Sequence, residues 1–110
     1  MDLQVTDNQA QSRFEIRADG ELAGFAEYEM SGDEIVFIHT ETEDRFRGHG
    51  LAGTLVQSAL EEVRDRKLEV LPYCPFVRSW IAEHIEYAGL VPDDMRPGFG
   101  LLPASSPRRR

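Results

Sequence analysis

Cysteine is almost absent from this chain of 110 residues, in which Cys74 is the one cysteine. A lone cysteine excludes a disulfide within the chain and any metal site that needs several thiolates. This composition fits a reducing compartment. Histidine is scarce too, and His39, His49 and His84 are scattered without a cluster of carboxylates around them. The sequence therefore predicts no metal site.

Basic side chains are outnumbered, since 12 lysines and arginines face 20 aspartates and glutamates and give a net charge of −8. A negative field opposes a sequence-independent grip on phosphate backbones, so no nucleic-acid partner is expected. The three arginines at 108–110 are too few to change that expectation. The field favours a cationic partner such as an amine, although the same charge also serves as a plain solubility device.

Long apolar runs are missing, and no segment has the length needed to cross a bilayer. The first residues also lack the basic segment and apolar core that are typical of a signal peptide. We therefore expect no membrane partner, and a cytoplasmic location is predicted by default.

The remaining composition is ordinary for a globular protein, with 41% hydrophobic and 29% charged residues. A chain of this length can bury one modest core, which predicts a single domain over residues 13–93. The polar residues 1–12 predict a flexible N-terminus. Residues 94–110, in which proline, glycine and arginine recur, predict a disordered tail.

Three antiparallel strands are predicted in the first half of the domain. Apolar and charged residues alternate over 14–18, as they do in a half-buried strand. The turn signal at 19–20 separates this strand from a second one over 22–30. A further turn precedes the third strand, over 34–40.

Two helices joined by a strand are predicted in the second half. From Leu51 to Val63 apolar residues recur at spacings of three and four, which predicts an amphipathic helix that ends near Lys67. Residues 68–71 predict a fourth strand, and a right-handed crossover would make it parallel to the third. Helical spacing resumes after Pro75 and continues to residue 89. The predicted fold class is therefore mixed α/β.

Gly48, Gly50 and Gly53 have the spacing G-x-G-x-x-G, and Glu69 lies 21 positions after Gly48. These features would suit a dinucleotide-binding fingerprint. That fingerprint needs its first glycine directly after a strand, but seven residues separate Thr40 from Gly48. The dinucleotide interpretation is therefore disfavoured.

Written as R-x-x-G-x-G, the same segment predicts an anion-binding turn at the start of a helix. Glycines let the backbone approach an anion closely, and the amides and dipole at the start of a helix attract a pyrophosphate. Arg45 and Arg47 could reach the phosphates. No lysine followed by serine or threonine comes after Gly50, which argues against nucleoside triphosphate hydrolysis of the Walker type. An ordinary helix-start turn is the alternative.

The sequence RFRGHGLAGTLV at 45–56 resembles the signature of the GNAT acetyltransferase superfamily. Together with IHTE at 38–41, PYCPFV at 72–77 and EHIEY at 83–87, it is similar to a small single-domain branch with a cysteine near the acetyl group. The resemblance covers about residues 13–93. It implies a GNAT-like fold, with three antiparallel strands followed by a β-α-β unit and a closing helix.

The resemblance also implies that acetyl-CoA is the co-substrate and lies between two splayed strands. Backbone near Glu41 and Thr42 would line the pantetheine arm, although Thr42 stands where the branch more often has valine. The amides around Phe46 to Gly50 would hold the pyrophosphate, and Leu51 and Ala52 would continue the site into the helix. The expected cofactor-binding residues are Glu41, Thr42, Arg45, Phe46, Arg47, Gly48, His49, Gly50, Leu51 and Ala52.

Cys74 lies between Pro72 and Pro75, just before the predicted closing helix. A helix N-terminus stabilises a thiolate, so a nucleophilic role is physically reasonable. Cys74 would either take the acetyl group transiently or lie beside the thioester while an amine attacks directly. The alternative is a buried small hydrophobe, because free cysteine is among the most buried residue types.

His39 is the other candidate catalytic residue. Strict alternation would put it on the strand face of Ile35 and Phe37, from which it could accept a proton from the incoming amine. A satisfied core histidine is the alternative. His49, inside the glycine turn, should point to solvent or toward a phosphate. The segment from Phe76 to His84 has the spacing of a helix face turned to the core.

The predicted function is acetyl transfer from acetyl-CoA to an amine on a small molecule or a protein. Two other functions remain open. One is a non-catalytic acyl-CoA-binding or regulatory module, because so short a domain has little chain for an acceptor pocket. The other is a cysteine hydrolase that pairs Cys74 with His39 or His84. The sequence identifies neither the acceptor nor the oligomeric state.

Overall fold

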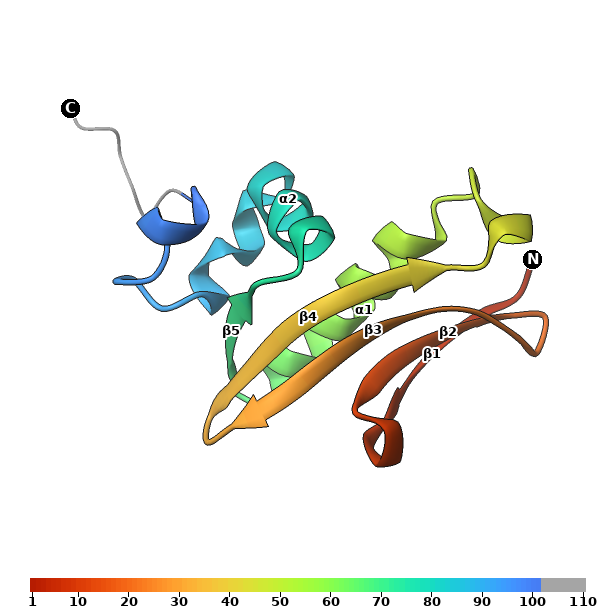
Figure 1. The fold of residues 1–110 in the computed structure, drawn as a ribbon, viewed down its shortest axis with the longest axis horizontal. Helices are drawn as coiled ribbons and strands as arrows, with labels where there is room; N and C mark the ends of the chain where they lie inside the picture. Colours follow the sequence, from red (N-terminus) through yellow and green to blue (C-terminus); the bar gives the residue numbers. More distant parts are fainter. Residues whose placement is uncertain (102–110) are drawn as a thin grey trace.

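One five-stranded sheet organises the protein in the computed structural model, which describes residues 1–101 (Figure 1). The strands lie in chain order, the first four pair antiparallel, and the fifth pairs parallel to the fourth. The strands are β1 (Leu3–Asn8), β2 (Arg13–Ala18), β3 (Glu21–Ser31), β4 (Glu34–Thr42) and β5 (Glu69–Pro72). The helices are α1 (Leu51–Asp65) and α2 (Pro75–Glu83), with short 3-10 turns η1 (Gln9–Gln11), η2 (Asp44–Phe46), η3 (Ile85–Leu90) and η4 (Pro97–Phe99).

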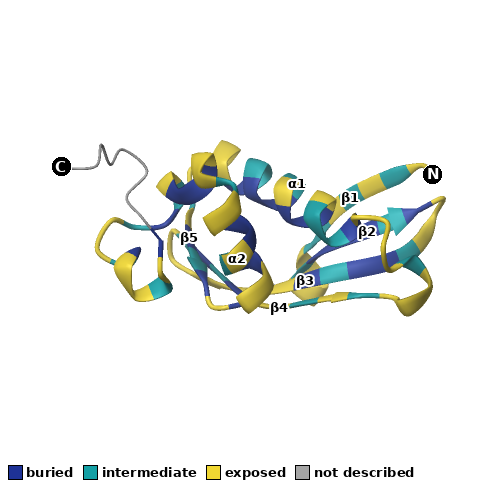
Figure 2. Ribbon diagram, turned by 90° about the horizontal axis from the view of Figure 1, so that it is seen from above, coloured by how far each residue is buried: buried dark blue, intermediate teal, exposed yellow. Residues whose placement is uncertain are grey.

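The expected crossover is confirmed, because α1 connects β4 to β5 and the two strands pair parallel from Glu34 with Glu69 to Phe37 with Pro72. α1 covers one face of the sheet, and buried residues concentrate between the two layers (Figure 2). α2 packs against α1, β4 and β5. Among residues 1–101, neither helix combines the length and the apolar character that crossing a bilayer requires.

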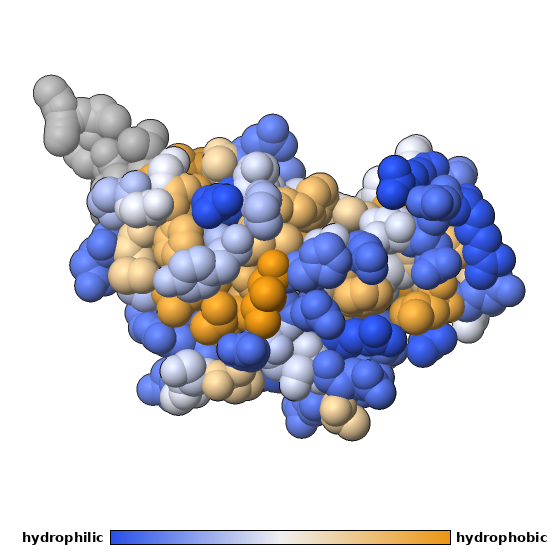
Figure 3. Space-filling view, in the orientation of Figure 1, coloured by the Kyte–Doolittle hydropathy of each residue, from blue (hydrophilic) through white to orange (hydrophobic). Residues whose placement is uncertain are grey.

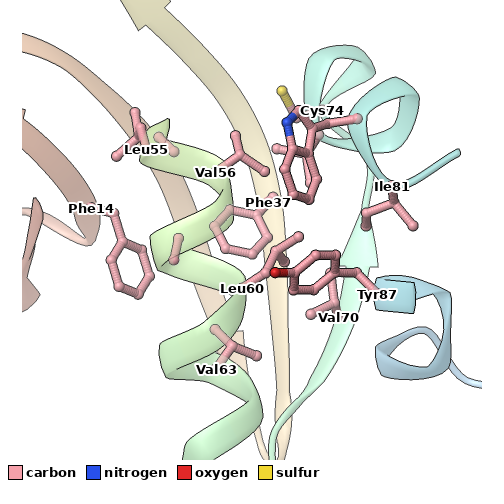
Figure 4. Close-up of a cluster of buried hydrophobic side chains, with 14 of the residues drawn as sticks. Phe14, Phe37, Leu55, Val56, Leu60, Val63, Val70, Cys74, Ile81 and Tyr87 are labelled. Carbon is pink, nitrogen blue, oxygen red and sulfur yellow. The ribbon is translucent and has the colours of Figure 1, made fainter. Parts of the chain in front are cut away.

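The core is built from side chains of α1 and the sheet that face each other. On α1 the buried side chains recur every three or four residues, so they form one stripe. Figure 4 shows Leu55 and Leu60 of this stripe beside Phe14 and Phe37 of the sheet. Truncating one of these leucines to alanine would cost about 2–5 kcal/mol of stability, so the two layers hold each other firmly.

The prediction of a flexible N-terminus is wrong, because residues 3–8 form β1. Leu3 and Val5 alternate with exposed residues and pack against the core. Asp7, on the same face, accepts a hydrogen bond from the hydroxyl of Tyr28 at 2.6 Å. It also forms an ion pair at 2.7 Å with Arg66, the residue that directly follows α1. The short alternation of apolar and polar residues was missed because the segment is polar overall. The residues that hold this strand, Tyr28 and Arg66, lie far away in the sequence.

The predicted closing helix is shorter than expected. α2 ends at Glu83, and the backbone of His84 leaves helical geometry with φ of −128° and ψ of 71°. The imidazole of His84 stacks on Trp80 with ring centroids 3.8 Å apart, and its Nδ1 donates to the Trp80 carbonyl at 2.8 Å. The chain then continues as the 3-10 turn η3 rather than as helix up to residue 89.

Part of the predicted disordered tail is folded. Leu101 is buried, and the buried side chain of Arg96 donates from Nε to the Val91 carbonyl at 2.9 Å. Residues 94–101 therefore pack on the domain. The remaining part of the predicted tail, 102–110, lies outside the described residues.

Candidate functional site

The site begins where β4 and β5 separate. β5 ends at Pro72, the amide of Cys74 still donates to the Phe37 carbonyl at 2.8 Å, and the chain then turns into α2. β4 continues to Thr42 and pairs there with β3 only. On the side of β4 that pairs with β5, the residues after Phe37 have no strand partner within residues 1–101. This open backbone edge can bind an extended ligand.

A bulge in β4 decides which side chains face the site. Glu27 of β3 pairs with His39 and Tyr28 pairs with Phe37, so Ile38 is an extra residue without a partner in β3. A bulge of this kind shifts the alternation by one position. Thr40 therefore lies on the face of the core, while His39 lies on the opposite face.

The predicted position of His39 is consequently wrong. The residue does not share the face of Ile35 and Phe37, and 52% of its side chain is exposed. Its Nε2 lies 3.7 Å from Glu41 Oε2, and its ring meets Phe25 edge-on at 6.3 Å. The structure thus separates His39 from Cys74 by the thickness of β4.

Cys74 is 2% exposed and caps the N-terminus of α2 without a side-chain hydrogen bond to the helix amides. Figure 4 shows its sulfur at the beginning of α2. The sulfur lies 3.3 Å from the hydroxyl oxygen of Thr40. Thr40 is a functional candidate that the sequence did not reveal, because its orientation depends on the bulge.

The glycine turn has a backbone conformation that favours glycine at two positions. Gly48 and Gly50 have φ of 83° and 72°, values that other residues adopt only with strain. Gly50 is the residue before α1 and supplies no capping side chain. The first helical hydrogen bond of α1 runs from the Thr54 amide to the Gly50 carbonyl at 3.2 Å.

Not all of the expected amides are available. The amides of Phe46 and Arg47 already donate to Glu43 and Asp44 at 2.9 and 3.1 Å, because residues 44–46 form the 3-10 turn η2. The predicted donor cluster from Phe46 to Gly50 is therefore too wide.

The amides of residues 48–53 donate to no acceptor within the described part of the chain. A helix start leaves such donors unpaired and carries a positive dipole end. The arrangement suits an anion such as a diphosphate.

Two adjoining cavities connect this turn with the open edge of β4, and we call them together the β4 groove. Figure 3 shows the surface hollowed between α2 and the glycine turn. One cavity, of about 270 Å³, is lined by Thr42, Phe46, Arg47, Gly48, Gly50, Leu51, Ala52, Gly53 and Phe76. The other, of about 330 Å³, is lined by Thr40, Glu41, Thr42, Arg47, Ala52 and Phe76. The groove therefore runs from the free amides to Thr40.

The two arginines of the turn differ in position. Arg47 lines both cavities, and its Nε contacts Asp44 at 3.0 Å. Arg45 lines neither of them and instead pairs with Glu21 at 3.2 Å. Both ion pairs are exposed, so each contributes at most about 1 kcal/mol. Either arginine could therefore leave its carboxylate partner and bind a phosphate instead.

Only some of the other residues that the sequence singled out line the β4 groove. His49 is exposed and is not among the residues that line the groove, whereas Leu51 and Ala52 are. Phe76, which the helical spacing assigned to the core, is 41% exposed and lines the groove, because it belongs to the first turn of α2. Trp80 is buried as expected.

The described residues do not form a cysteine-histidine pair of the kind that a hydrolase uses. His39 faces away from Cys74, and the Nδ1 of His84 is engaged with the Trp80 carbonyl. The hydrolase alternative therefore lacks its activating base.

Comparison with known proteins gives a consistent result. Residues 13–90 match the model of the GCN5-related N-acetyl-transferase family. The protein NATD1 of Gallus gallus is 30% identical over 84 residues, which cover 74% of this chain and 76% of the relative. NATD1 of Mus musculus is 34% identical over 58 residues, which span about half of each protein (52% and 53%).

Solved structures show the same fold. A GCN5-like protein from Staphylococcus aureus superposes with a TM-score of 0.63 at 20% identity, over 82% of this chain and 88% of that one. The ribosomal-protein-S18-alanine N-acetyltransferase of Escherichia coli gives a TM-score of 0.50 at 20% identity, over 53% of this chain and 38% of the enzyme. The resemblance inferred from the glycine turn is confirmed: this chain belongs to the GCN5-related N-acetyltransferase family.

Proposed function

We propose that this chain binds acetyl-CoA in the β4 groove and transfers the acetyl group to an amine. The observation that carries the proposal is the course of the groove. It starts at the amides of residues 48–53, which donate to no acceptor within residues 1–101, follows the open edge of β4, and reaches Thr40 beside Cys74. Family membership supports the same reaction class.

Binding would use three parts of the groove. The diphosphate would take hydrogen bonds from the amides of residues 48–52, with Arg47 as a mobile counter-charge. The pantetheine arm would lie along the open edge at Glu41 and Thr42, between β4 and Phe76. The thioester would then reach the end of the groove at Thr40.

The acetyl group would move directly from CoA to the amine. Cys74 is buried and is not among the residues that line the groove, which favours a place beside the thioester over a covalent role. The protein would act chiefly by holding the thioester and the amine in a reactive geometry.

The base is the second catalytic role. An attacking amine must lose a proton, and His39 is a half-exposed imidazole on β4, one residue before Thr40. Glu41, whose Oε2 lies 3.7 Å from Nε2 of His39, would orient the ring.

The test is mass spectrometry of candidate amines, both small molecules and peptides, after incubation with acetyl-CoA. The proposal expects acetylated products and one equivalent of free CoA for each. Saturable CoA binding without turnover on any amine would instead identify a non-catalytic acyl-CoA-binding module.

A pair of variants tests the groove itself. Arg47→Ala should weaken CoA binding several-fold in calorimetry, because Arg47 lines both cavities. Arg45→Ala is the matched control, since Arg45 is similarly exposed but lies outside them. Equal losses in the two variants would contradict the assigned path of the diphosphate.

A further inference from the structure

Thr40 connects the buried sulfur of Cys74 with the β4 groove. Its oxygen is 3.3 Å from the sulfur, and Thr40 lines the larger cavity of the groove. Cys74 does not line that cavity and is 2% exposed. A ligand at this end of the groove therefore meets Thr40, with the thiol behind this residue.

The hydrogen-bonding capacity of the two groups suggests how they are arranged. A hydroxyl has one donor and two acceptor positions, whereas a thiol has one weak donor. Within residues 1–101, the hydroxyl of Thr40 is the one side-chain partner of the Cys74 sulfur. When the S–H donates to the Thr40 oxygen, the hydroxyl proton of Thr40 has no acceptor among the described residues and is free to point into the groove.

We propose that the Thr40 hydroxyl donates a hydrogen bond to the carbonyl oxygen of the acyl thioester, and that Cys74 is the positioning residue that orients this hydroxyl. The inference rests on the proposed acetyl transfer. It makes Thr40 a catalytic residue and gives the buried thiol a role without a covalent bond to the acetyl group.

The assignment is consistent with the chemistry of the transfer. The amine nitrogen forms a bond to the carbonyl carbon, and the carbonyl oxygen gains the negative charge that the Thr40 hydroxyl stabilises. The carbon–sulfur bond then breaks, and CoA leaves with the electron pair. The amine proton ends on the CoA sulfur, so the products are an amide and free CoA. A donor aimed at such an oxygen is typically worth a factor of roughly 10²–10³ in kcat.

Side-chain exchanges at both positions test the arrangement. Thr40→Val keeps the shape and removes the hydroxyl, and we expect kcat to fall about 100-fold while the KM for acetyl-CoA changes little. Thr40→Ser restores the hydroxyl and should recover most of the activity. Cys74→Ser keeps a donor toward Thr40 and should remain active, whereas Cys74→Ala should lose roughly tenfold.

Melting temperature and CoA affinity, measured for each variant, separate a catalytic defect from a folding defect. An unchanged kcat in Thr40→Val would overturn the role of Thr40. Inactivity of Cys74→Ser, together with an acetyl adduct on Cys74 of the unmodified chain, would overturn the positioning role and make the thiol a nucleophile. Absence of turnover by the unmodified chain on every amine would refute the proposed function, and with it this inference.

Discussion

Replacing Gly50 by alanine tests the glycine turn with little steric interference. Gly50 directly precedes α1 with φ of 72°, and a Cβ built on it would meet no atom within 4 Å. The cost of the change is therefore conformational, and it amounts to about 1–2 kcal/mol for an L-residue held in the left-handed region. Gly48, with φ of 83° and equally free space, should behave in the same way.

The strain must appear in one of two measurements. If the free protein keeps its turn, the free energy of unfolding falls by about 1–2 kcal/mol. If the turn relaxes, the amides around Gly50 lose their alignment, and binding of a diphosphate must restore the strained conformation. The same energy then raises the Kd for CoA roughly 5- to 30-fold, because 1.4 kcal/mol corresponds to a factor of ten. We expect the second outcome, because the turn is exposed and its amides have no protein acceptors within residues 1–101.

Gly53→Ala is the matched control within the same cavity. Gly53 lies in the first turn of α1 without a positive φ, and its added Cβ would sit 3.4 Å from Nε1 of Trp80, an ordinary contact. Alanine in a helix should leave stability unchanged or raise it by up to about 1 kcal/mol. Calorimetry with CoA and urea unfolding of the three variants provide both readouts. The reasoning is refuted if Gly48→Ala and Gly50→Ala bind CoA as tightly as Gly53→Ala.

Three further predictions concern the parts of the fold that hold the site in place. Tyr28→Phe removes the hydrogen bond to Asp7 and should lower the free energy of unfolding by about 1–2 kcal/mol at pH 7, measured in urea, without changing CoA affinity. Burial raises the pKa of Glu15, but hydrogen bonds chiefly from Arg13 outweigh it, so its pKa lies below the ordinary value. The stability that Glu15 contributes is therefore present above about pH 4.5 and is lost as the pH falls through the lowered pKa. The stability difference between the unmodified chain and Glu15→Gln should shrink over that range, and a constant difference would contradict it. Arg96→Leu leaves a buried carbonyl without its donor and should cost about 1–3 kcal/mol in thermal or urea unfolding, whereas no loss would mean that the hydrogen bond from Arg96 to Val91 does not stabilise the fold.

Local patterns were sufficient where the physical cause is local. The bounds of α1 follow from apolar spacing, and the parallel crossover follows from a strand-helix-strand order that has one favoured hand. The turn at Gly48 and Gly50 requires positive φ values, and the sequence supplies glycine at both places. Family membership could be inferred for the same reason, since its signature lies within this one continuous segment.

Pairing over long distances decided the rest. The register of β4 against β3 inserts Ile38, turns Thr40 toward Cys74 and sends His39 to the other face, and no alternation in the sequence marks this bulge. β1 is held by its pairing with β2 and by the hydrogen bond from Tyr28 to Asp7. Residues 94–101 are held to the domain in part by the hydrogen bond from Arg96 to the Val91 carbonyl. The sequence by itself determined the helix, the glycine turn and the family, because each depends on neighbouring residues. Only the tertiary structure decided which side chains meet at the end of the groove, because a one-residue shift in strand register exchanges the two faces of a strand.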